Sequence, residues 1–215
     1  MDVAVPASLG PGRLVVDAAE TPSAVLWLGH GAGGGIGALD LSALAAALPG
    51  RGITVVRYEQ PWRVAGRRVA PRPATLDVAW LEAAPLVEQL AGGLPIVAGG
   101  RSAGARVACR TAASVGAAAV VCLAFPLHPP GRPEKSRLSE LLTPEVPILV
   151  VQGERDTFGS AATLEAEVGG RPGIHIVAVP GADHSMRVAA SSPLNAHAVA
   201  ELVTSSVADF VGEVA

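Results

Sequence analysis

The sequence predicts an α/β fold in which a doubly wound, mostly parallel sheet is flanked by helices. Two observations lead to this prediction: short β-rich runs alternate with helical patterns along the 215 residues, and most of the β-rich runs are continuously apolar. Strands covered on both faces have such apolar runs, whereas strands with one face in water alternate. Because no repeat or linker divides the chain, residues 1–215 are expected to form a single domain.

Buried strands are expected where the apolar and β-branched residues cluster. These segments are 13–17, 24–28, 54–58, 95–98, 119–124, 148–152 and 175–179. In a sheet of this kind, ligands bind at the carboxyl ends of the strands. The loops that follow the strands are therefore the places to look for chemistry.

Helical patterns lie between and after these strands, at 39–48, 76–90, 103–114, 161–168 and 193–214. Thr75 is expected to cap the second of these helices, and the glycine pair at 92–93 to end it. Pro85 lacks a backbone donor, so we expect it to kink or break the same helix.

The pentapeptide Gly-Arg-Ser-Ala-Gly at 100–104 fits the G-x-S-x-G pattern of a serine nucleophile elbow. It follows the apolar run 94–99 and precedes a helical segment rich in Ala, Arg and Val. This strand–turn–helix context suits the pattern, because small flanking residues allow the helix to start close to the strand. Ser102 is therefore the candidate nucleophile.

A glycine-rich turn at 29–35 follows the predicted strand 24–28. Such a turn lets backbone amides approach a substrate oxygen, and the candidate oxyanion donors are the amides of Ala32 and Ala103. A phosphate-binding loop is the rival interpretation. It is disfavoured because the spacing of a dinucleotide fingerprint fails at Ala38 and no Gly-Lys-Ser/Thr follows.

Two later strand ends supply the acid and the base that a serine nucleophile needs. Asp156 follows one predicted strand and His184 follows the last one, which matches the nucleophile–acid–base chain order of α/β-hydrolases. Glu154 is the alternative acid, and Asp156 itself has a rival interpretation as a turn carboxylate or helix cap. Asp183 is expected to be a surface or turn residue.

Four runs support a resemblance to a known family: GHGAGG at 29–34, GRSAG at 100–104, FPLHPPG at 125–131 and GADH at 181–184. They resemble a small, capless α/β-hydrolase family that is distantly related to dienelactone hydrolase. This family also includes a subunit of the non-specific lethal histone acetyltransferase complex. The resemblance implies an α/β-hydrolase fold without a separate cap domain. The chain differs from dienelactone hydrolase itself, which has a Cys nucleophile where this chain has Ser102.

Two loops are candidates for setting specificity. Segment 59–73 contains Trp62 and four arginines, and it is expected to be either a solvated loop or a lid that favours acidic substrates. The proline-rich segment 125–136 contains His128, for which contact with the pocket and bonding to local backbone are equally expected. The candidate substrate-binding residues are His30, Trp62, Arg63, Arg101 and His128. For His30, shaping the glycine turn is favoured over proton transfer.

Composition excludes several other classes of function. The net charge of −3 gives no reason to expect nucleic acid or a membrane surface as a partner. No segment has the pattern of a membrane-spanning helix or of a secretory signal peptide. Cys109 and Cys122 are expected to be buried free thiols, which suits a cytoplasmic protein. No His/Cys/Asp set has metal-ligand spacing, so neither a metal nor a cofactor is expected.

Together these features predict a serine hydrolase that acts on a carboxylic ester or thioester of a small substrate. Ser102, His184 and Asp156 would be nucleophile, base and orienting acid. The alternative is a non-catalytic α/β-hydrolase module that binds a protein partner, and a peptidase is a third possibility. The oligomeric state is not predicted.

Overall fold

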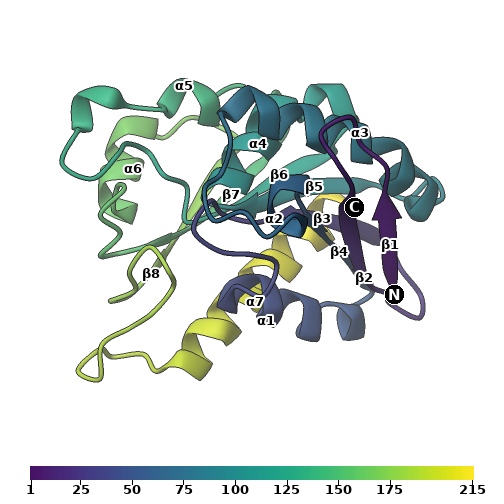
Figure 1. Cartoon of the computed structure of the whole chain (residues 1–215). Helices are drawn as coiled ribbons and strands as arrows, with labels where there is room; N and C mark the ends of the chain where they lie inside the picture. The colour runs from purple at the N-terminus through teal and green to yellow at the C-terminus, as the bar shows by residue number, and fades with distance from the viewer.

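An eight-stranded sheet forms the centre of the computed structural model, which describes residues 1–215 (Figure 1). The strands are β1 (Asp2–Val5), β2 (Gly12–Asp17), β3 (Ala24–Gly29), β4 (Ile53–Glu59), β5 (Ile96–Arg101), β6 (Ala119–Leu123), β7 (Ile148–Gly153) and β8 (Ile174–Val179). Their order is β1-β2-β4-β3-β5-β6-β7-β8. Strands β1 and β2 are antiparallel to their neighbours and all later pairs are parallel, which confirms the predicted fold class.

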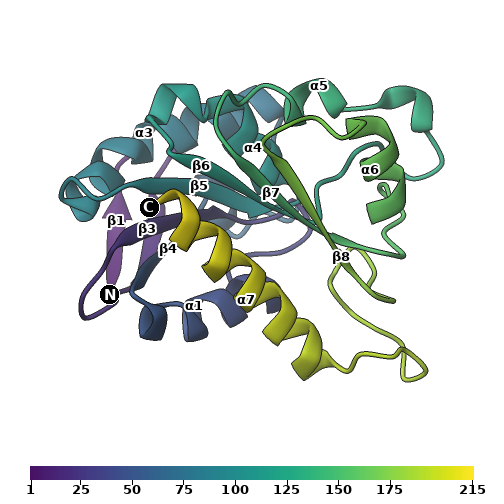
Figure 2. The ribbon, with the colours of Figure 1, turned by 180° about the vertical axis from the view of Figure 1, so that it is seen from behind.

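Helices cover both faces of this sheet (Figures 1 and 2). They are α1 (Leu39–Ala47), α2 (Pro61–Val64), α3 (Pro73–Ala91), α4 (Ala103–Thr111), α5 (Leu138–Leu141), α6 (Ala161–Val168) and α7 (Ala196–Val214). Helices α1 and α7 pack together on one face, where Leu44 and Val203 belong to the same apolar core cluster. Helices α3, α4 and α6 cover the other face and contribute Trp80, Val107 and Leu164 to a second cluster.

Helix α3 begins earlier than predicted and is not broken at Pro85. It begins at Pro73 after Arg72, so Thr75 lies inside the helix rather than at its cap. Proline suits this first position because its missing N–H would have no helical acceptor there. The helix also runs unbroken through Pro85, whose exposed position places the affected turn on the solvent side. It ends at Gly92, as expected, in the left-handed conformation with φ 58°.

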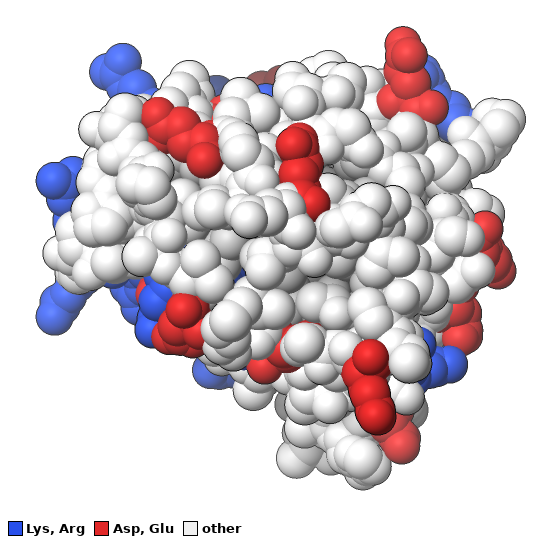
Figure 3. All heavy atoms as spheres, turned by 90° about the vertical axis from the view of Figure 1, so that its right-hand side faces the viewer, with Lys and Arg blue, Asp and Glu red and all other residues white.

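Strand β1 was not expected from the sequence. Its four residues are too few and too exposed for an apolar pattern, and it becomes a strand only by pairing with β2, with Asp2 opposite Val15. On this edge of the molecule, shown in Figure 3, acidic side chains are scattered over a mostly uncharged surface.

The two cysteines are buried free thiols that form no disulfide, as predicted. Cys109 lies on α4 and Cys122 on β6, and their Sγ atoms are 3.5 Å apart. The hydrogen bond with Cys109, together with burial, raises the pKa of the Cys122 thiol well above its usual range. The raised pKa and burial make the Cys122 thiol a poor nucleophile.

Candidate active site

Ser102 lies at the sharp turn between β5 and α4, at the carboxyl edge of the sheet. Its backbone has φ 53° and ψ −109°, a conformation that non-glycine residues rarely adopt. Its amide donates to the carbonyl of Leu123 over 2.9 Å, which holds the turn against β6. Such strain clusters at functional sites and here turns the Ser102 side chain out of the strand.

The glycines of the elbow allow a close backbone approach to the end of β3. A Cβ added at Gly100 would lie 2.5 Å from the carbonyl oxygen of Gly29, and one added at Gly104 would overlap the same oxygen. A side chain at Gly100 would therefore push β3 away from β5, and one at Gly104 would push α4 away from β3. The glycine spacing of the pentapeptide follows from this packing.

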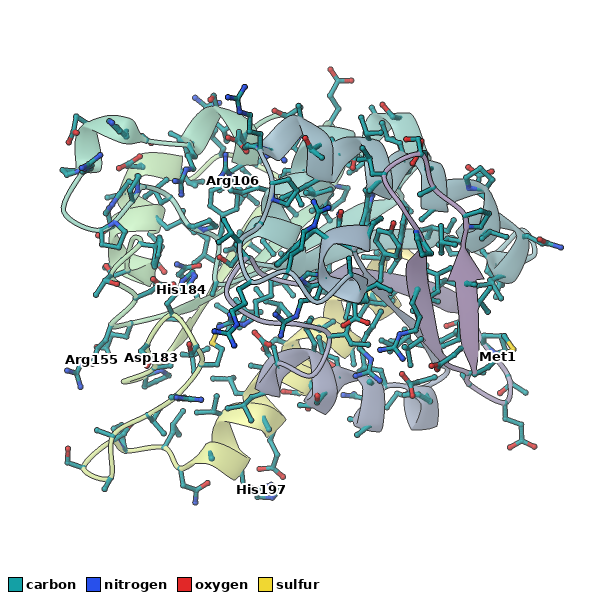
Figure 4. All side chains as sticks on the ribbon, in the orientation of Figure 1. Met1, Arg106, Arg155, Asp183, His184 and His197 are labelled. Carbon is teal, nitrogen blue, oxygen red and sulfur yellow. The ribbon has the colours of Figure 1, made fainter.

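The structure brings the three predicted side chains together. His184, on the loop after β8 (Figure 4), has its Nε2 2.9 Å from Ser102 Oγ and its Nδ1 2.8 Å from Asp156 Oδ2. The buried carboxylate can only accept, so Nδ1 is the protonated ring nitrogen and Nε2 accepts from the serine hydroxyl. This is the arrangement in which a histidine can take the Ser102 proton.

Asp156 is itself held on both oxygens. Its Oδ2 accepts from Gln152 Nε2 over 3.1 Å, and its Oδ1 accepts from the Phe158 amide over 2.8 Å. The Phe158 ring stacks on the imidazole of His184, with centroids 4.2 Å apart. Gln152 and Phe158 were missed by the sequence analysis. The one available signal was Gln152, a polar residue that ends a predicted apolar strand.

Two backbone amides near Ser102 have no acceptor within the protein. They are those of Ala32, in the turn after β3, and of Ala103, the first residue of α4. The N–H groups of a first helical turn have no helical acceptor and favour negative charge. Both amides are therefore free to donate to an oxyanion formed beside Ser102.

Ser102 lines a solvent-accessible cleft with a volume of about 380 Å³. One wall is the glycine turn and the start of α1, and the other is the loop of His184, Ser185 and Arg187. No residue of segments 59–73 or 125–136 lines this cleft. Gln60, Trp62 and Ala70 of the first segment instead line a small neighbouring cavity that shares Gly31 and Ala32 with the cleft.

Arg101 lines the cleft, and its guanidinium is hydrogen-bonded within the protein. Its Nε donates to Asp40 Oδ2 over 2.9 Å, and its Nη2 donates to the carbonyl of His184. Asp40, near the start of α1, has a fully buried side chain. Burial raises the pKa of Asp40, and the Arg101 charge opposes this shift. Asp40 could not be identified from sequence because its partner lies 61 residues away.

His30 and Trp62, two of the expected substrate contacts, are both buried. His30 Nδ1 donates to the carbonyl of Gly31 over 2.9 Å, and Nε2 accepts from the Gln60 amide over 3.2 Å. Burial lowers the pKa of His30 and favours this neutral form. His30 therefore shapes the glycine turn, as favoured from the sequence, with Trp62 packed beside it at a centroid distance of 5.5 Å.

Arg63 and His128 also lie outside the cleft. Arg63 lies on α2, and its side chain approaches the glycine turn at Gly35. His128 Nδ1 bonds to the carbonyl of Pro129 over 3.0 Å, which is the local backbone interaction expected as one of its two alternatives.

The remaining candidate acids do not reach His184. Glu154 is exposed and accepts from the Gly181 amide over 2.7 Å, and Asp183 accepts from the amides of Ser185 and Arg187 within its own turn. The structure has no cluster of three or more His, Cys, Asp or Glu side chains suited to a metal ion. No helix combines the length and apolar character that a bilayer crossing demands.

Comparison with known proteins agrees with this fold. Residues 22–212 match the model of a family described as an alpha/beta hydrolase domain. A serine hydrolase homologue from Coxiella burnetii is 18% identical, with a TM-score of 0.77 over 96% of this chain and 97% of that chain. A serine hydrolase without lid from Xanthomonas campestris is 19% identical, with a TM-score of 0.76 over 98% and 94%.

A dienelactone hydrolase from Anabaena variabilis is 19% identical, with a TM-score of 0.71 over 100% of this chain and 95% of that chain. At these identities the structural likeness shows the fold. No curated protein matches the sequence.

Proposed function

Because the chain belongs to the alpha/beta hydrolase domain family, we propose that it is a serine hydrolase that cleaves a carboxylic ester or thioester of a small substrate. The observation that supports this most directly is the hydrogen-bonded series Asp156–His184–Ser102 at the base of an open cleft. The solved structures of similar fold include proteins described as serine hydrolases and a dienelactone hydrolase, which agrees with this reaction class.

The first half-reaction is acylation of Ser102. His184 Nε2 takes the hydroxyl proton as Oγ attacks the carbonyl carbon, and the carbonyl oxygen becomes an anion that the amides of Ala32 and Ala103 stabilise. The tetrahedral intermediate collapses when the bond from carbon to the departing oxygen or sulfur breaks. The departing atom takes the proton from His184, which leaves an acyl-enzyme on Ser102.

The second half-reaction is hydrolysis of that acyl-enzyme. His184 Nε2 takes a proton from water as the water oxygen attacks the acyl carbon, and Ser102 Oγ leaves and receives the proton back. Asp156 stays ionised and accepts from His184 Nδ1 throughout, so it orients the ring and stabilises the imidazolium. The products are a carboxylic acid and an alcohol or thiol.

Labelling with a fluorophosphonate probe tests this proposal. The wild-type protein is expected to form a covalent adduct that is absent from Ser102→Ala. The matched control is Ser114→Ala, which removes an exposed serine outside the cleft and should label fully. Hydrolysis of p-nitrophenyl esters and acyl thioesters should be lost in Ser102→Ala and retained in Ser114→Ala.

The alternative is a protein-binding module without catalysis, in line with the resemblance to a family that includes a subunit of the non-specific lethal histone acetyltransferase complex. Folded wild-type protein that neither labels nor hydrolyses any ester would favour this alternative and exclude the hydrolase.

A further inference from the structure

A second cavity adjoins the cleft at Ser102. It has a volume of about 460 Å³ and lies between the start of α1, the loop after His184 and the first turns of α7. Leu39 and Arg187 line both cavities, so the two lie next to each other. Figures 1 and 2 show α1 and α7 side by side on this face of the sheet. We refer to this second cavity as the α1–α7 groove.

The α1–α7 groove is apolar. Ten of its 14 lining residues are hydrophobic, and the larger ones include Met186, Val188, Leu194 and Val199. Leu39, where the cleft meets the groove, is 58% exposed although its side chain is apolar. An apolar chain that entered the groove would remove these surfaces from water, which is favourable in proportion to the area covered.

Hydrogen bonds fix the backbone conformation of the groove wall next to His184. Met186 is buried and has φ 55°, an uncommon backbone conformation for a long side chain. The Asp183 carboxylate maintains this turn by accepting from the amides of Ser185 and Arg187 over 2.8 and 2.9 Å. The opposite wall is the first turn of α7, where Asn195 Oδ1 caps the Ala198 amide over 2.9 Å.

The position of the groove relative to His184 indicates which part of an ester enters it. The departing atom must lie within hydrogen-bond reach of His184 Nε2, because that nitrogen returns the proton. Met186 and Arg187 follow His184 on the same loop and line the groove. The carbonyl oxygen is meanwhile directed toward the amides of Ala32 and Ala103. The chain beyond the departing atom therefore continues along the His184 loop.

We infer that the α1–α7 groove binds the leaving group, and that the preferred substrates are esters or thioesters of linear apolar alcohols or thiols. This inference rests on the proposed hydrolase function and adds its substrate class. Each methylene that enters the groove is expected to raise kcat/KM about fourfold.

Two series of esters test the inference. In the first, acetate is esterified with ethanol, butanol, hexanol or octanol. In the second, ethanol is esterified with acids of the same chain lengths. In the wild type, kcat/KM should rise steeply along the alcohol series and weakly along the acid series. A steep rise along the acid series alone, or no rise in either, would overturn the inference.

A variant pair localises the effect. Ala200→Trp places a large side chain in the groove, and Glu201→Trp places the same side chain on the neighbouring exposed position of α7. Ala200→Trp should lower kcat/KM for octyl acetate about tenfold or more and so flatten the rise along the alcohol series. Glu201→Trp should change neither, and circular dichroism would verify that both variants fold.

Binding of 1-octanol separates this inference from the proposed function. Titration of 1-octanol into Ser102→Ala, which cannot turn over, should show saturable binding that Ala200→Trp abolishes in the same background. Absence of binding would overturn the inference even if esters are hydrolysed. Binding without any ester hydrolysis or probe labelling would instead refute the proposed reaction while supporting the groove.

Discussion

The guanidinium of Arg101 donates to the carboxylate of Asp40, with Nε–O distances of 2.9 and 3.2 Å, and so connects the start of α1 to the elbow. Its Nη2 also donates to the backbone carbonyl of His184. One side chain thus joins three segments that are far apart in sequence. Because the carbonyl belongs to the proposed base, we propose that Arg101 positions His184.

Asp40→Asn is expected to lower kcat about tenfold to a hundredfold with little change in KM. Without the charge of Asp40, Arg101 is no longer held under the His184 loop, and a displacement of about 1 Å in a catalytic group costs up to about a hundredfold in rate. The control is Asp77→Asn, which removes one of the two carboxylate partners of Arg110, between α3 and α4 on the other face of the sheet. A fall in kcat of the same size in both variants would mean that the effect is one of general stability.

Asp156→Asn is expected to lower kcat about ten-thousandfold while the protein remains folded. An amide at this position can donate to His184 and favours the tautomer whose Nε2 carries the proton, which cannot accept from Ser102. Glu154→Gln, the control on the same loop, should retain activity because Glu154 is exposed and bonds only to the Gly181 amide. If Glu154→Gln were the inactive variant, the acid would be wrongly assigned.

Gly104→Ala is expected to lower the free energy of unfolding by about 1–3 kcal/mol. The added Cβ would overlap the carbonyl of Gly29, which is backbone and cannot rotate away. Gly212→Ala is the matched helical control. Nothing lies within 4 Å of the Cβ it would add, so it should raise the free energy of unfolding by about 0.5–1 kcal/mol. Urea unfolding of the two variants measures both effects, and equal stability would contradict the packing argument.

His30 makes stability depend on pH. Burial lowers its pKa below the ordinary value of about 6.5, against smaller opposing effects of the Gly31 hydrogen bond and Glu59. The unfolded chain therefore binds the proton more readily than the folded one, and stability falls as pH drops below about 6.5. Urea unfolding at pH 7.5 and pH 5.5 should show this loss in the wild type.

The loss should be smaller in His30→Gln, which cannot be protonated. His197→Gln removes an exposed histidine and should behave as the wild type. An identical pH response in the wild type and in His30→Gln would show that another group is responsible.

The order of strands and helices could be predicted because buried parallel strands require continuous apolar runs. The positions of Ser102, Asp156 and His184 followed from the same regularity. Each comes shortly after a parallel strand, and parallel strands place their carboxyl ends at one edge of the sheet. Strand β1 could not be predicted in this way, because a short edge strand is defined by its partner rather than by its own pattern.

By itself, the sequence determined the fold and the three residues that meet at Ser102, since both depend on local patterns repeated along the chain. Only the tertiary structure decided what surrounds them. The partners of Arg101 lie 61 and 83 residues away along the chain. Gln152 donates a hydrogen bond to Asp156 inside the protein. The α1–α7 groove is formed by one segment near the start of the chain and another near its end. Contacts of this kind depend on where the sheet brings distant segments together, and no local pattern encodes that.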